Sequence, residues 1–377
     1  MNTPTPARPT VAVVGGGYAG INVAKQLDDV ADVVLVEPKD TFVHNVALLR
    51  ALADPSWLPR IFLPYDRLLA RGRVVRDRVV KAEPGQLTLA SGQSLAPDYL
   101  VLATGSAYPF PAKTDVDATA DAHHKIRQAH AALAPAARVL LIGAGPVGVE
   151  LAGEIKAAWP DKQVTLLDVA DDVMGERFRP DLKAEVRRQL AELGVELLLS
   201  SPLRQPPPTA PGELAPFTVT TQAGRELSAD IWFRCYGVSP VSDYLAGDLA
   251  SARRPDGFIE VNPHLQVPGH TRVFALGDVS DADHKMAGLA SRQAQVVAAN
   301  ITALITGEGD LKAWEPMPPV IIVPIGPEGG SGQLPDATDL ATPELVAQLK
   351  GRDMMTDRYS TLLGLTPPSP NPSQPST

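Results

Sequence analysis

Short apolar runs alternate along the chain with longer stretches in which apolar residues recur at helical spacing. Runs of this length, bounded by Gly, Asp or Pro, are typical of strands buried on both faces, and helices alternate with such strands in parallel α/β sheets. The pattern therefore predicts a parallel α/β fold. The predicted strands cover residues 11–14, 33–36, 99–103, 139–142, 164–167, 231–234 and 273–276, and a long helical pattern covers about 286–304.

Other segments fall outside this alternation. Residues 200–217 are rich in proline, which cannot donate to a central ladder, so we predict a surface loop between edge strands. A polyproline segment that binds a partner is the alternative. Residues 318–335 predict a strand and a glycine-rich turn, which is not a phosphate loop because no Lys-Ser/Thr pair follows its glycines. The two ends, residues 1–10 and 366–377, are rich in Pro, Ser and Thr and are predicted to be disordered.

A glycine motif of the form GxGxxG follows the first predicted strand directly, at Gly15, Gly17 and Gly20. In a dinucleotide-binding turn the first glycine permits the tight turn, the second lets a pyrophosphate approach the backbone, and the third lets the next helix pack on the strand. The N-terminus of that helix offers free N–H groups to the phosphates. The second strand ends at Glu37, whose carboxylate can accept both hydroxyl protons of an adenosine ribose. The segment therefore predicts a dinucleotide site.

The same arrangement occurs a second time, at Gly143, Gly145 and Gly148, and its second strand ends at Asp168. Two complete units make a chance match a poor explanation. Because a carboxylate at Asp168 repels a 2′-phosphate, we predict that this second site prefers NADH over NADPH.

Charged residues beyond Asp168 act on this preference in both directions. Asp171 and Asp172 add to the repulsion of a 2′-phosphate, whereas either Arg177 or Arg179 could reach a phosphate. NADPH therefore stays the less favoured alternative.

The composition narrows the function classes. With 377 residues, 44% of them hydrophobic and 20% charged, the chain predicts a globular protein of two or more domains. Its formal net charge of −9 argues against nucleic acid as a partner. The single cysteine, Cys235, cannot form an internal disulfide, which fits a reducing compartment. We find no apolar run long enough to span a bilayer, no secretory signal and no metal-binding motif, so we expect a cytoplasmic location.

Two further segments place both units in one architecture. The stretch 99–106, YLVLATGS, and the stretch 272–281, RVFALGDVSD, are buried-type strands that end in glycine, the second at Gly277 and Asp278. This order of motifs resembles the flavoprotein oxidoreductases with two dinucleotide-binding domains. The segments KDTFVHNVALLRA (39–51) and HKMAGLASRQAQVVAANI (284–301) resemble the apoptosis-inducing-factor-like mitochondrion-associated oxidoreductases, which include the ferroptosis-suppressor quinone reductases. The type II NADH dehydrogenases are similar more distantly.

The resemblance implies two Rossmann-like domains, with the FAD domain split by an inserted NAD(H) domain, and a small C-terminal α+β region. The implied boundaries are 1–10 disordered, 11–110 for the first part of the FAD domain, 111–255 for the NAD(H) domain, 256–305 for the second part of the FAD domain, 306–365 for the C-terminal region and 366–377 for a disordered tail.

The motifs and the resemblance together predict the residues around each cofactor. Those expected at FAD are Gly15, Gly17, Tyr18, Ala19, Gly20, Glu37, Asn45, Arg50, Val80, Ala103, Thr104, Gly105, Gly277, Asp278, Lys285, Met286 and Ala287. Those expected at NADH are Gly143, Gly145, Pro146, Val147, Gly148, Glu150, Asp168 and Gly237.

Three of the side chains are candidates for catalysis. Lys285 precedes the long helix, so its ammonium and the helix N-terminus could face the flavin pyrimidine edge; the alternative is an exposed loop lysine. The resemblance places His44 beside the isoalloxazine, although the same segment could simply cap a helix, with Asn45 as the N-cap. It also places Glu150 near the nicotinamide, the alternative being an exposed helix carboxylate. Glu154, one turn further on, is interpreted as a surface residue.

The predicted activity is an FAD-dependent NAD(P)H:quinone oxidoreductase. Reduction of disulfides needs a cysteine pair beside the flavin, and the chain has only Cys235, so that class is excluded. The alternatives are a reductase for a small iron–sulfur protein of the ferredoxin or rubredoxin type, and a redox-responsive NADH-binding flavoprotein with a signalling role. Tyr236 replaces the Thr or Ala common in the family, and could shape the nicotinamide pocket or simply pack.

The C-terminal segment 344–365 predicts one or two amphipathic helices around Gly351. In the resembled family this part packs near the flavin and helps to form the quinone side. We expect its apolar face to pack on the protein, with peripheral contact to a membrane surface as the alternative. The oligomeric state is expected to be a monomer or a homodimer.

Overall fold

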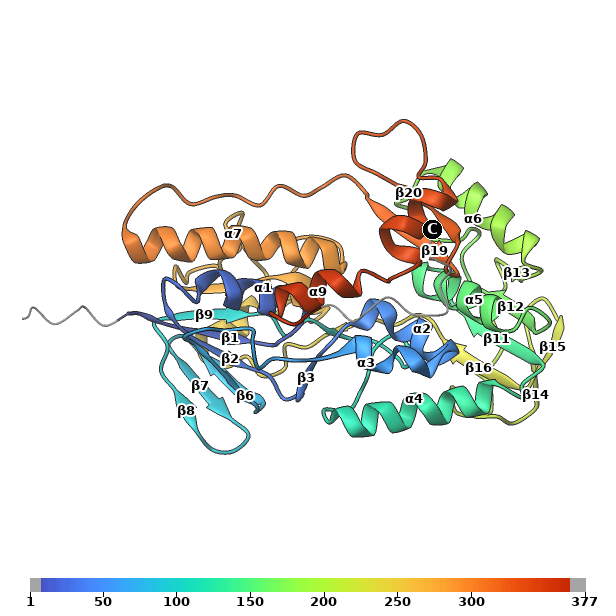
Figure 1. Cartoon of the computed structure of the whole chain (residues 1–377), viewed down its shortest axis with the longest axis horizontal. Helices are drawn as coiled ribbons and strands as arrows, with labels where there is room; N and C mark the ends of the chain where they lie inside the picture. The colour runs from blue at the N-terminus through green and yellow to red at the C-terminus, as the bar shows by residue number, and fades with distance from the viewer. Residues whose placement is uncertain (1–7, 367–377) are drawn as a thin grey trace, which may run out of the picture.

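The computed structural model describes residues 8–366, so nearly all of both predicted disordered ends lies outside the described residues. Two Rossmann-like units stand next to each other along the long axis, and C-terminal elements lie across both (Figure 1). We call the unit that contains the first glycine motif the first unit, and the other the second unit. The predicted α/β fold class is confirmed.

The first unit is a five-stranded parallel sheet. In spatial order its strands are β18 (Val273–Ala275), β9 (Tyr99–Leu102), β1 (Thr10–Val14), β2 (Asp32–Val36) and β5 (Arg73–Val75). The helices α1 (Tyr18–Leu27) and α7 (Ala287–Thr306) cover one face, and an antiparallel sheet of β6 (Val79–Glu83), β7 (Gln86–Leu89) and β8 (Ser94–Leu95) covers the other (Figure 1). Both faces are therefore buried, which explains the uninterrupted apolar runs of the strands.

The second unit is a four-stranded parallel sheet. Its strands, in spatial order, are β13 (Glu196–Leu198), β12 (Gln163–Leu167), β11 (Arg138–Ile142) and β16 (Ile231–Arg234). One face packs against α5 (Pro146–Ala158) and α6 (Pro180–Glu192), and the other against the hairpin of β14 (Phe217–Thr220) and β15 (Glu226–Ala229). The proline-rich residues between β13 and β14 form the predicted loop, which leaves the sheet at its edge.

Short elements join the two units. The two-stranded ribbon of β10 (Ser106–Ala107) and β17 (Ser239–Pro240) links them. The other connecting elements are β3 (Thr41–Val43), α2 (Leu48–Ala53), α3 (Leu58–Ile61), β4 (Phe62–Pro64) and α4 (Thr119–Leu133), with 3₁₀ turns at Asn45–Ala47, Pro55–Trp57, Gly247–Ala252 and Gly277–Val279.

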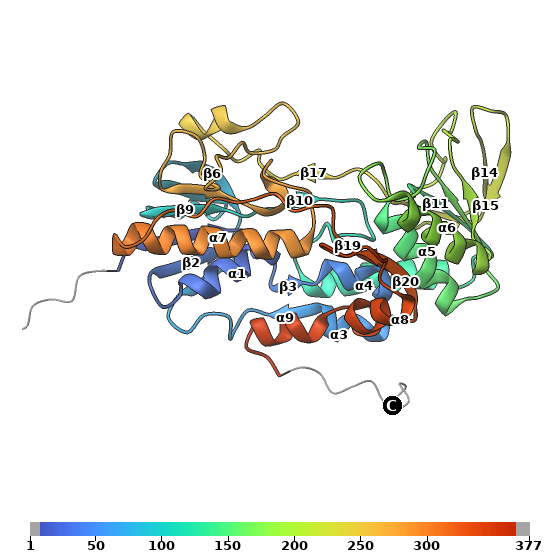
Figure 2. The same ribbon diagram turned by 90° about the horizontal axis from the view of Figure 1, so that it is seen from above.

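The C-terminal region crosses from the first unit to the second and partly back. After α7 the chain runs back along that helix (Figure 2) and enters the hairpin of β19 (Ile321–Ile325) and β20 (Gly329–Gln333). There follow α8 (Pro343–Val346), a π-helical turn (Ala347–Gly351) and α9 (Thr356–Leu362). The predicted strand is β19, and a turn with Gly326 follows it, but the other glycines of this region belong to β20 rather than to the turn. At Gly330 a Cβ atom would lie 2.3 Å from Val323 O, so close strand pairing requires glycine there.

Both ends of this region are packed on the protein. The apolar residues of β19 join the core of the second unit, and Tyr359 and Leu363, in and just after α9, join the core of the first. The expectation that residues 344–365 pack on the protein is confirmed for most of their apolar side chains, with Leu349 at 44% exposure as the exception. Among residues 8–366, no helix is both long enough and apolar enough to cross a membrane.

Candidate active site between the two glycine turns

The first glycine turn joins β1 to α1, and each of its three glycines has a different surrounding. Gly15 has a φ of +103°, and a Cβ atom there would lie 2.5 Å from Ala103 O of the neighbouring strand end. A Cβ atom at Gly20 would lie 1.8 Å from Gly15 O. At Gly17, by contrast, no described atom outside the chain neighbours lies within 4 Å of a Cβ position. The turn is therefore closed on the protein side and open where a ligand would approach.

The second turn, between β11 and α5, repeats this geometry closely. Gly143 has a φ of +112° and would place a Cβ atom 2.8 Å from Cys235 O. At Gly148 a Cβ atom would lie 1.9 Å from Gly143 O, whereas at Gly145 no described atom lies within 4 Å. The backbone thus requires glycine at the first and third positions of both turns, as the spacing predicts, whereas the role of the second glycine toward a pyrophosphate stays a prediction.

The two acidic strand ends lie against their turns. Glu37 accepts hydrogen bonds from Gly16 N at 2.6 Å and from Lys39 N at 2.9 Å. Asp168 likewise accepts from Ala144 N at 2.5 Å and from Ala170 N at 2.9 Å. Each carboxylate is held at the carboxyl edge of its sheet, and its remaining lone pairs can accept from ribose hydroxyls.

The helices that follow the turns have free N-termini. Among the described residues, no side chain caps α1 at Gly17 or α5 at Gly145, and neither first turn contains an acidic residue. The unpaired N–H groups and the positive end of each helix dipole therefore face the open space beside Gly17 and Gly145. Both turns fit a pyrophosphate, and the chemistry of the two sites fits the adenosine diphosphate halves of FAD and of a nicotinamide dinucleotide.

Asp278, the acid after β18, reaches the junction of the two units. It accepts from Ser106 Oγ at 2.7 Å and from Lys113 Nζ at 3.0 Å. Sequence reasoning did not find Lys113, because it lies in an irregular segment without a motif. Gly277, beside Asp278, would place a Cβ atom 3.2 Å from Ala19, so the end of β18 lies directly against the start of α1.

Lys285 lies just before α7, as predicted, but its ammonium is turned toward the protein. It donates to Ser280 O at 2.6 Å and to Asp283 O at 2.7 Å, and it lies 4.3 Å from the centre of the Phe258 ring. Burial lowers its pKa. The side chain is half-buried, so the alternative of an exposed loop lysine is wrong. Its predicted role at the flavin stays a prediction.

His44 is fully buried and joins the first turn to the C-terminal region. Its Nε2–H donates to Met354 O at 2.6 Å, so its Nδ1 accepts from the Tyr18 hydroxyl at 3.0 Å, and Tyr18 Oη accepts from Val46 N. Burial lowers the pKa of His44 to about 4, so the imidazole is neutral at physiological pH. Asn45 begins a 3₁₀ turn and makes no capping bond there, so the interpretation of Asn45 as an N-cap was wrong.

Two carboxylates of α5, one helical turn apart, bind cations from different segments. Glu150 accepts from Lys350 Nζ at 2.8 Å, and Glu154 forms a two-pronged ion pair with Arg50 of α2. Arg50 also donates to Gly351 O at 2.8 Å. Glu154 is only 2% exposed, so its interpretation as a surface residue was wrong, and Glu150 is buried as well.

Sequence reasoning missed the partners because they are distant in the chain. Lys350 and Glu150 are 200 residues apart, and no local pattern relates them. The available signal was a lysine that follows the apolar residues Leu345, Val346 and Leu349 in a segment predicted to be an amphipathic helix. The guanidinium of Arg50 is directed at Glu154, so its predicted contact with FAD stays untested.

The remaining predicted FAD residues occupy mixed positions. Val80 lies on β6 and is about half exposed. Thr104 donates its hydroxyl hydrogen bond to Val241 O at 2.6 Å, away from the first turn. Met286 begins α7 without a side-chain cap among the described residues, and its side chain packs against the core of the second unit. Met286 therefore lies where the two units meet.

The two arginines that could reach a phosphate differ in their partners. Arg179 donates to Asp181 and to the carbonyls of residues 337 and 338. Arg177 has two buried nitrogens, Nε and Nη1, with no hydrogen-bond partner among the described residues. Of the two, only Arg177 has unpaired donors.

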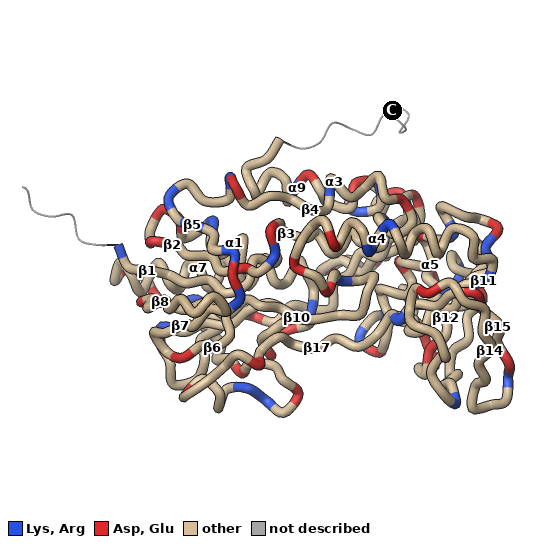
Figure 3. The backbone as a smooth tube through the Cα atoms, turned by 90° about the horizontal axis from the view of Figure 1, so that it is seen from below, with Lys and Arg blue, Asp and Glu red and all other residues tan. Residues whose placement is uncertain are grey.

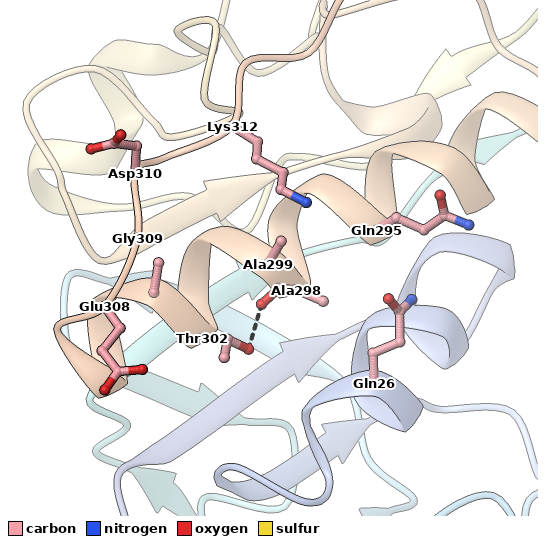
Figure 4. A pocket seen from close by; sticks show the side chains of 10 residues that line it. Gln26, Gln295, Ala298, Ala299, Thr302, Glu308, Gly309, Asp310 and Lys312 are labelled. Atoms are coloured by element: carbon pink, nitrogen blue, oxygen red, sulfur yellow. Dashed lines mark hydrogen bonds between the residues drawn. The ribbon is translucent and has the colours of Figure 1, made fainter.

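A surface hollow of about 580 Å³ lies elsewhere, on the outer side of α7 (Figure 4). Its lining comes from the end of α1, from α7 and from the loop after α7, including Gln26, Gln295 and Lys312. None of the residues predicted to hold a cofactor lines it, so it is separate from the candidate site.

The chain is similar to known proteins along most of its length. The model of the pyridine nucleotide-disulphide oxidoreductase family matches residues 9–300. The chain is 32% identical to ferroptosis suppressor protein 1 of Taeniopygia guttata, over 95% of this chain and 97% of that protein, and 30% identical to the Homo sapiens protein of that name, over 95% and 96%. It is 28% identical to apoptosis-inducing factor homolog B of Dictyostelium discoideum, over 95% and 98%.

Solved structures share the fold. The sulfide:quinone oxidoreductase of Aquifex aeolicus is similar with a TM-score of 0.73 at 19% identity, over 96% of this chain and 93% of that one. Putidaredoxin reductase, in its covalent complex with putidaredoxin, is similar with a TM-score of 0.68 at 24% identity, over 86% and 81%. With both glycine turns intact and the family model spanning them, the chain belongs to the pyridine nucleotide-disulphide oxidoreductase family and is an FAD-dependent oxidoreductase that uses NAD(P)H.

Proposed function

We propose that this protein is an NADH:quinone oxidoreductase. The overall reaction would convert NADH, a quinone and one proton into NAD⁺ and the quinol, so that two electrons and one proton leave NADH and the second proton comes from solvent. FAD supplies the chemistry between donor and acceptor, because it accepts a hydride and can pass the electrons on together or singly. The first turn, Glu37 and Asp278 would hold FAD, and the second turn with Asp168 would hold NADH.

The observation that carries the choice of donor is the end of β12. The Asp168 carboxylate is fixed by two backbone N–H groups, and the next residue, Val169, is 70% exposed and uncharged. A 2′-phosphate here would meet a carboxylate and an apolar side chain. Of the two nearby arginines, Arg179 is paired with Asp181, and the unpaired nitrogens of Arg177 are buried. NADH, with a ribose hydroxyl at this position, is the better fit.

The acceptor is assigned from the cysteine content and the relatives. Cys235 is buried and burial raises the pKa of its thiol to about 12, so it stays protonated and is not a redox thiolate. A matched solved structure is named as a sulfide:quinone oxidoreductase. These observations support an acceptor that needs no thiol in this chain, and a quinone meets that condition.

We assign roles in the reaction to residues where the two units meet. Glu150, buried and paired with Lys350, would fix the segment 350–359 beside the donor site. The uncapped N-terminus of α7 would stabilise negative charge on the pyrimidine edge of FAD. Lys285 would add to this effect by holding the 280–285 loop through its two carbonyl contacts.

The test is purification with the bound flavin identified, followed by anaerobic mixing with NADH and then with a panel of acceptors. We expect NADH to bleach the visible flavin absorbance and a short-chain quinone to restore it within one turnover. Failure of the first step would refute the donor assignment, and slow recovery with every quinone would refute the acceptor.

The acceptor panel should include a small iron–sulfur protein, because its rate of reduction distinguishes a quinone reductase from the main alternative, a reductase for such a protein. Docking of such an acidic partner would need a basic face. In the view of Figure 3, lysine and arginine positions are interspersed with aspartate and glutamate rather than gathered. We therefore expect the quinone to be reduced much faster than the iron–sulfur protein.

A further inference from the structure

The carboxyl end of β16 carries an arginine and a tyrosine that stack on one another. Arg234 Cζ lies 4.5 Å from the centre of the Tyr236 ring. Both side chains are exposed, Tyr236 at 49%. Phe233 and Cys235, by contrast, are buried in the core of the second unit.

The backbone beneath this stacked pair is held firmly against the second glycine turn. Cys235 N donates to Ile142 O at 2.8 Å, and Cys235 O accepts from the Tyr108 hydroxyl at 2.6 Å. The same carbonyl is the atom nearest to a Cβ position at Gly143. Arg234 and Tyr236 are therefore attached to a rigid support that includes the turn itself.

The N–H donors of the Arg234 guanidinium are available to a ligand. It makes no ion pair and no hydrogen bond with any residue in the described part of the chain. It lies beside Gly237, where a Cβ atom would come within 2.9 Å of Arg234 Nη2. The glycine and the tyrosine ring together keep the group beside the strand end, with its N–H groups unpaired.

The strand order indicates which part of a bound dinucleotide would lie closest to the Arg234 guanidinium. The order β12-β11-β16 places Asp168 on one side of the glycine turn and Arg234 on the other. A dinucleotide bound along this edge has its adenosine ribose at Asp168 and its pyrophosphate at the turn and the N-terminus of α5. The next group across the sheet, on the β16 side, is therefore the pyrophosphate's second phosphate and the nicotinamide ribose.

The distribution of charged residues also favours a phosphate on the β16 side of the second turn. The first turn of α5 contains no basic residue, and Asp168, Asp171 and Asp172 all follow β12. A pyrophosphate would bring two further negative charges to this edge. Arg234 is a cation on the side where they would be repelled least, and a charge-assisted hydrogen bond from a planar guanidinium is the interaction that suits a phosphate best.

We infer that Arg234 binds the pyrophosphate of the dinucleotide donor and that Tyr236 holds the guanidinium in place for that contact. This inference rests on the proposed function, in which the second turn binds NADH. It gives Tyr236 a positioning role that differs from packing, and it makes Arg234 a determinant of affinity for donors that carry phosphate.

The test compares two donors in the flavin-containing protein. NADH carries the pyrophosphate, whereas dihydronicotinamide riboside delivers the same hydride without any phosphate. For Arg234→Ala we expect the concentration of NADH needed for half-maximal flavin reduction to rise about tenfold or more, with the limiting rate little changed. With dihydronicotinamide riboside the variant should match the wild type. Arg234→Lys should retain part of the affinity, and Tyr236→Ala should weaken it about two- to threefold.

Arg225→Ala is the matched control, because Arg225 is exposed in the same unit and pairs with Glu196 away from the turn. Flavin content and the midpoint of thermal unfolding should be the same in all variants. If the wild type is not reduced by NADH, the proposed function fails. If the wild type is reduced and Arg234→Ala has unchanged NADH affinity, or loses both donors equally, the inference about Arg234 fails.

Discussion

The two glycine turns have nearly the same backbone, yet their surroundings differ. In the first turn, Tyr65 Oη donates to Gly16 O at 2.9 Å, Glu37 is buried, and Tyr18 is covered by Tyr359 of the C-terminal region at 5.0 Å between ring centres. Beside the second turn, Val169 and Tyr236 are exposed side chains, while Glu150 further along α5 is buried and bound by Lys350.

This difference indicates how one local motif can have two uses. A turn enclosed by side chains and by a returning chain segment suits a cofactor that stays bound, since release would require those contacts to open. A turn with exposed rims suits a donor that enters and leaves in each cycle.

The largest effect is expected from filling the third glycine of each turn. Gly20→Ala and Gly148→Ala would each place a Cβ atom within 2 Å of a carbonyl oxygen, at 1.8 Å and 1.9 Å. We expect Gly20→Ala to purify with little flavin. We expect Gly148→Ala to keep its flavin but to be reduced by NADH on the order of 100-fold more slowly, because the donor is displaced. Flavin stoichiometry and stopped-flow reduction measure the two, and equal flavin loss in both variants would contradict the comparison.

A smaller effect is expected from breaking the buried ion pair that links the two units. Arg50→Met leaves the Glu154 carboxylate buried without its partner, so we expect the free energy of unfolding to fall by about 3–5 kcal/mol. The double variant Arg50→Met, Glu154→Met should recover much of this loss, because no charge is left uncompensated. Arg188→Ala, which breaks exposed ion pairs within α6, should change the free energy of unfolding by less than about 1 kcal/mol. Urea unfolding of the holoprotein provides the measurement, and a fully additive double variant would argue against the pair.

The enclosed turn should also make stability depend on pH through His44. Its pKa is lowered to about 4 in the folded protein, below the usual value of about 6.5, so the unfolded chain binds a proton that the folded one does not. The contribution of neutral His44 to the free energy of unfolding is fully present above about pH 6.5. It decreases by ~3 kcal/mol as the pH falls toward 4. His44→Gln should remove this part of the slope. Unfolding free energies of both proteins between about pH 4.5 and 7.5 test it, and parallel curves would refute it.

The smallest effect concerns donor choice at the open turn. Asp168→Asn keeps the size of the side chain but removes the charge that repels a 2′-phosphate. We expect the ratio of NADH to NADPH efficiency to fall about tenfold, with flavin content unchanged because Asp168 lies outside the first turn. Flavin reduction rates at several concentrations of each nucleotide give the ratio. An unchanged ratio would show that another residue selects the donor.

The local features of this protein could be predicted because each depends on residues that are close together in the sequence. Both turns, the acids Glu37 and Asp168 and the seven strands follow from spacing and apolar runs, and they occur where the pattern predicts them. The contacts of the candidate site could not be predicted in the same way. Lys113 meets Asp278 from 165 residues away, and Glu154 looked like a surface residue because nothing near it in the sequence indicates that Arg50 covers it.

The two dinucleotide-binding turns can be recognised from the amino-acid sequence alone. A turn that requires glycine where φ is positive or where a carbonyl oxygen is close fixes the spacing of the glycines along the chain. The surroundings of the two turns, by contrast, arise only when the chain folds. They depend on Tyr359 packing on Tyr18 beside the first turn, on Lys350 binding Glu150 of α5, and on the contact of Arg234 with Tyr236. Packing between segments hundreds of residues apart has no local pattern, since it depends on the shapes of faces that form only when the units meet.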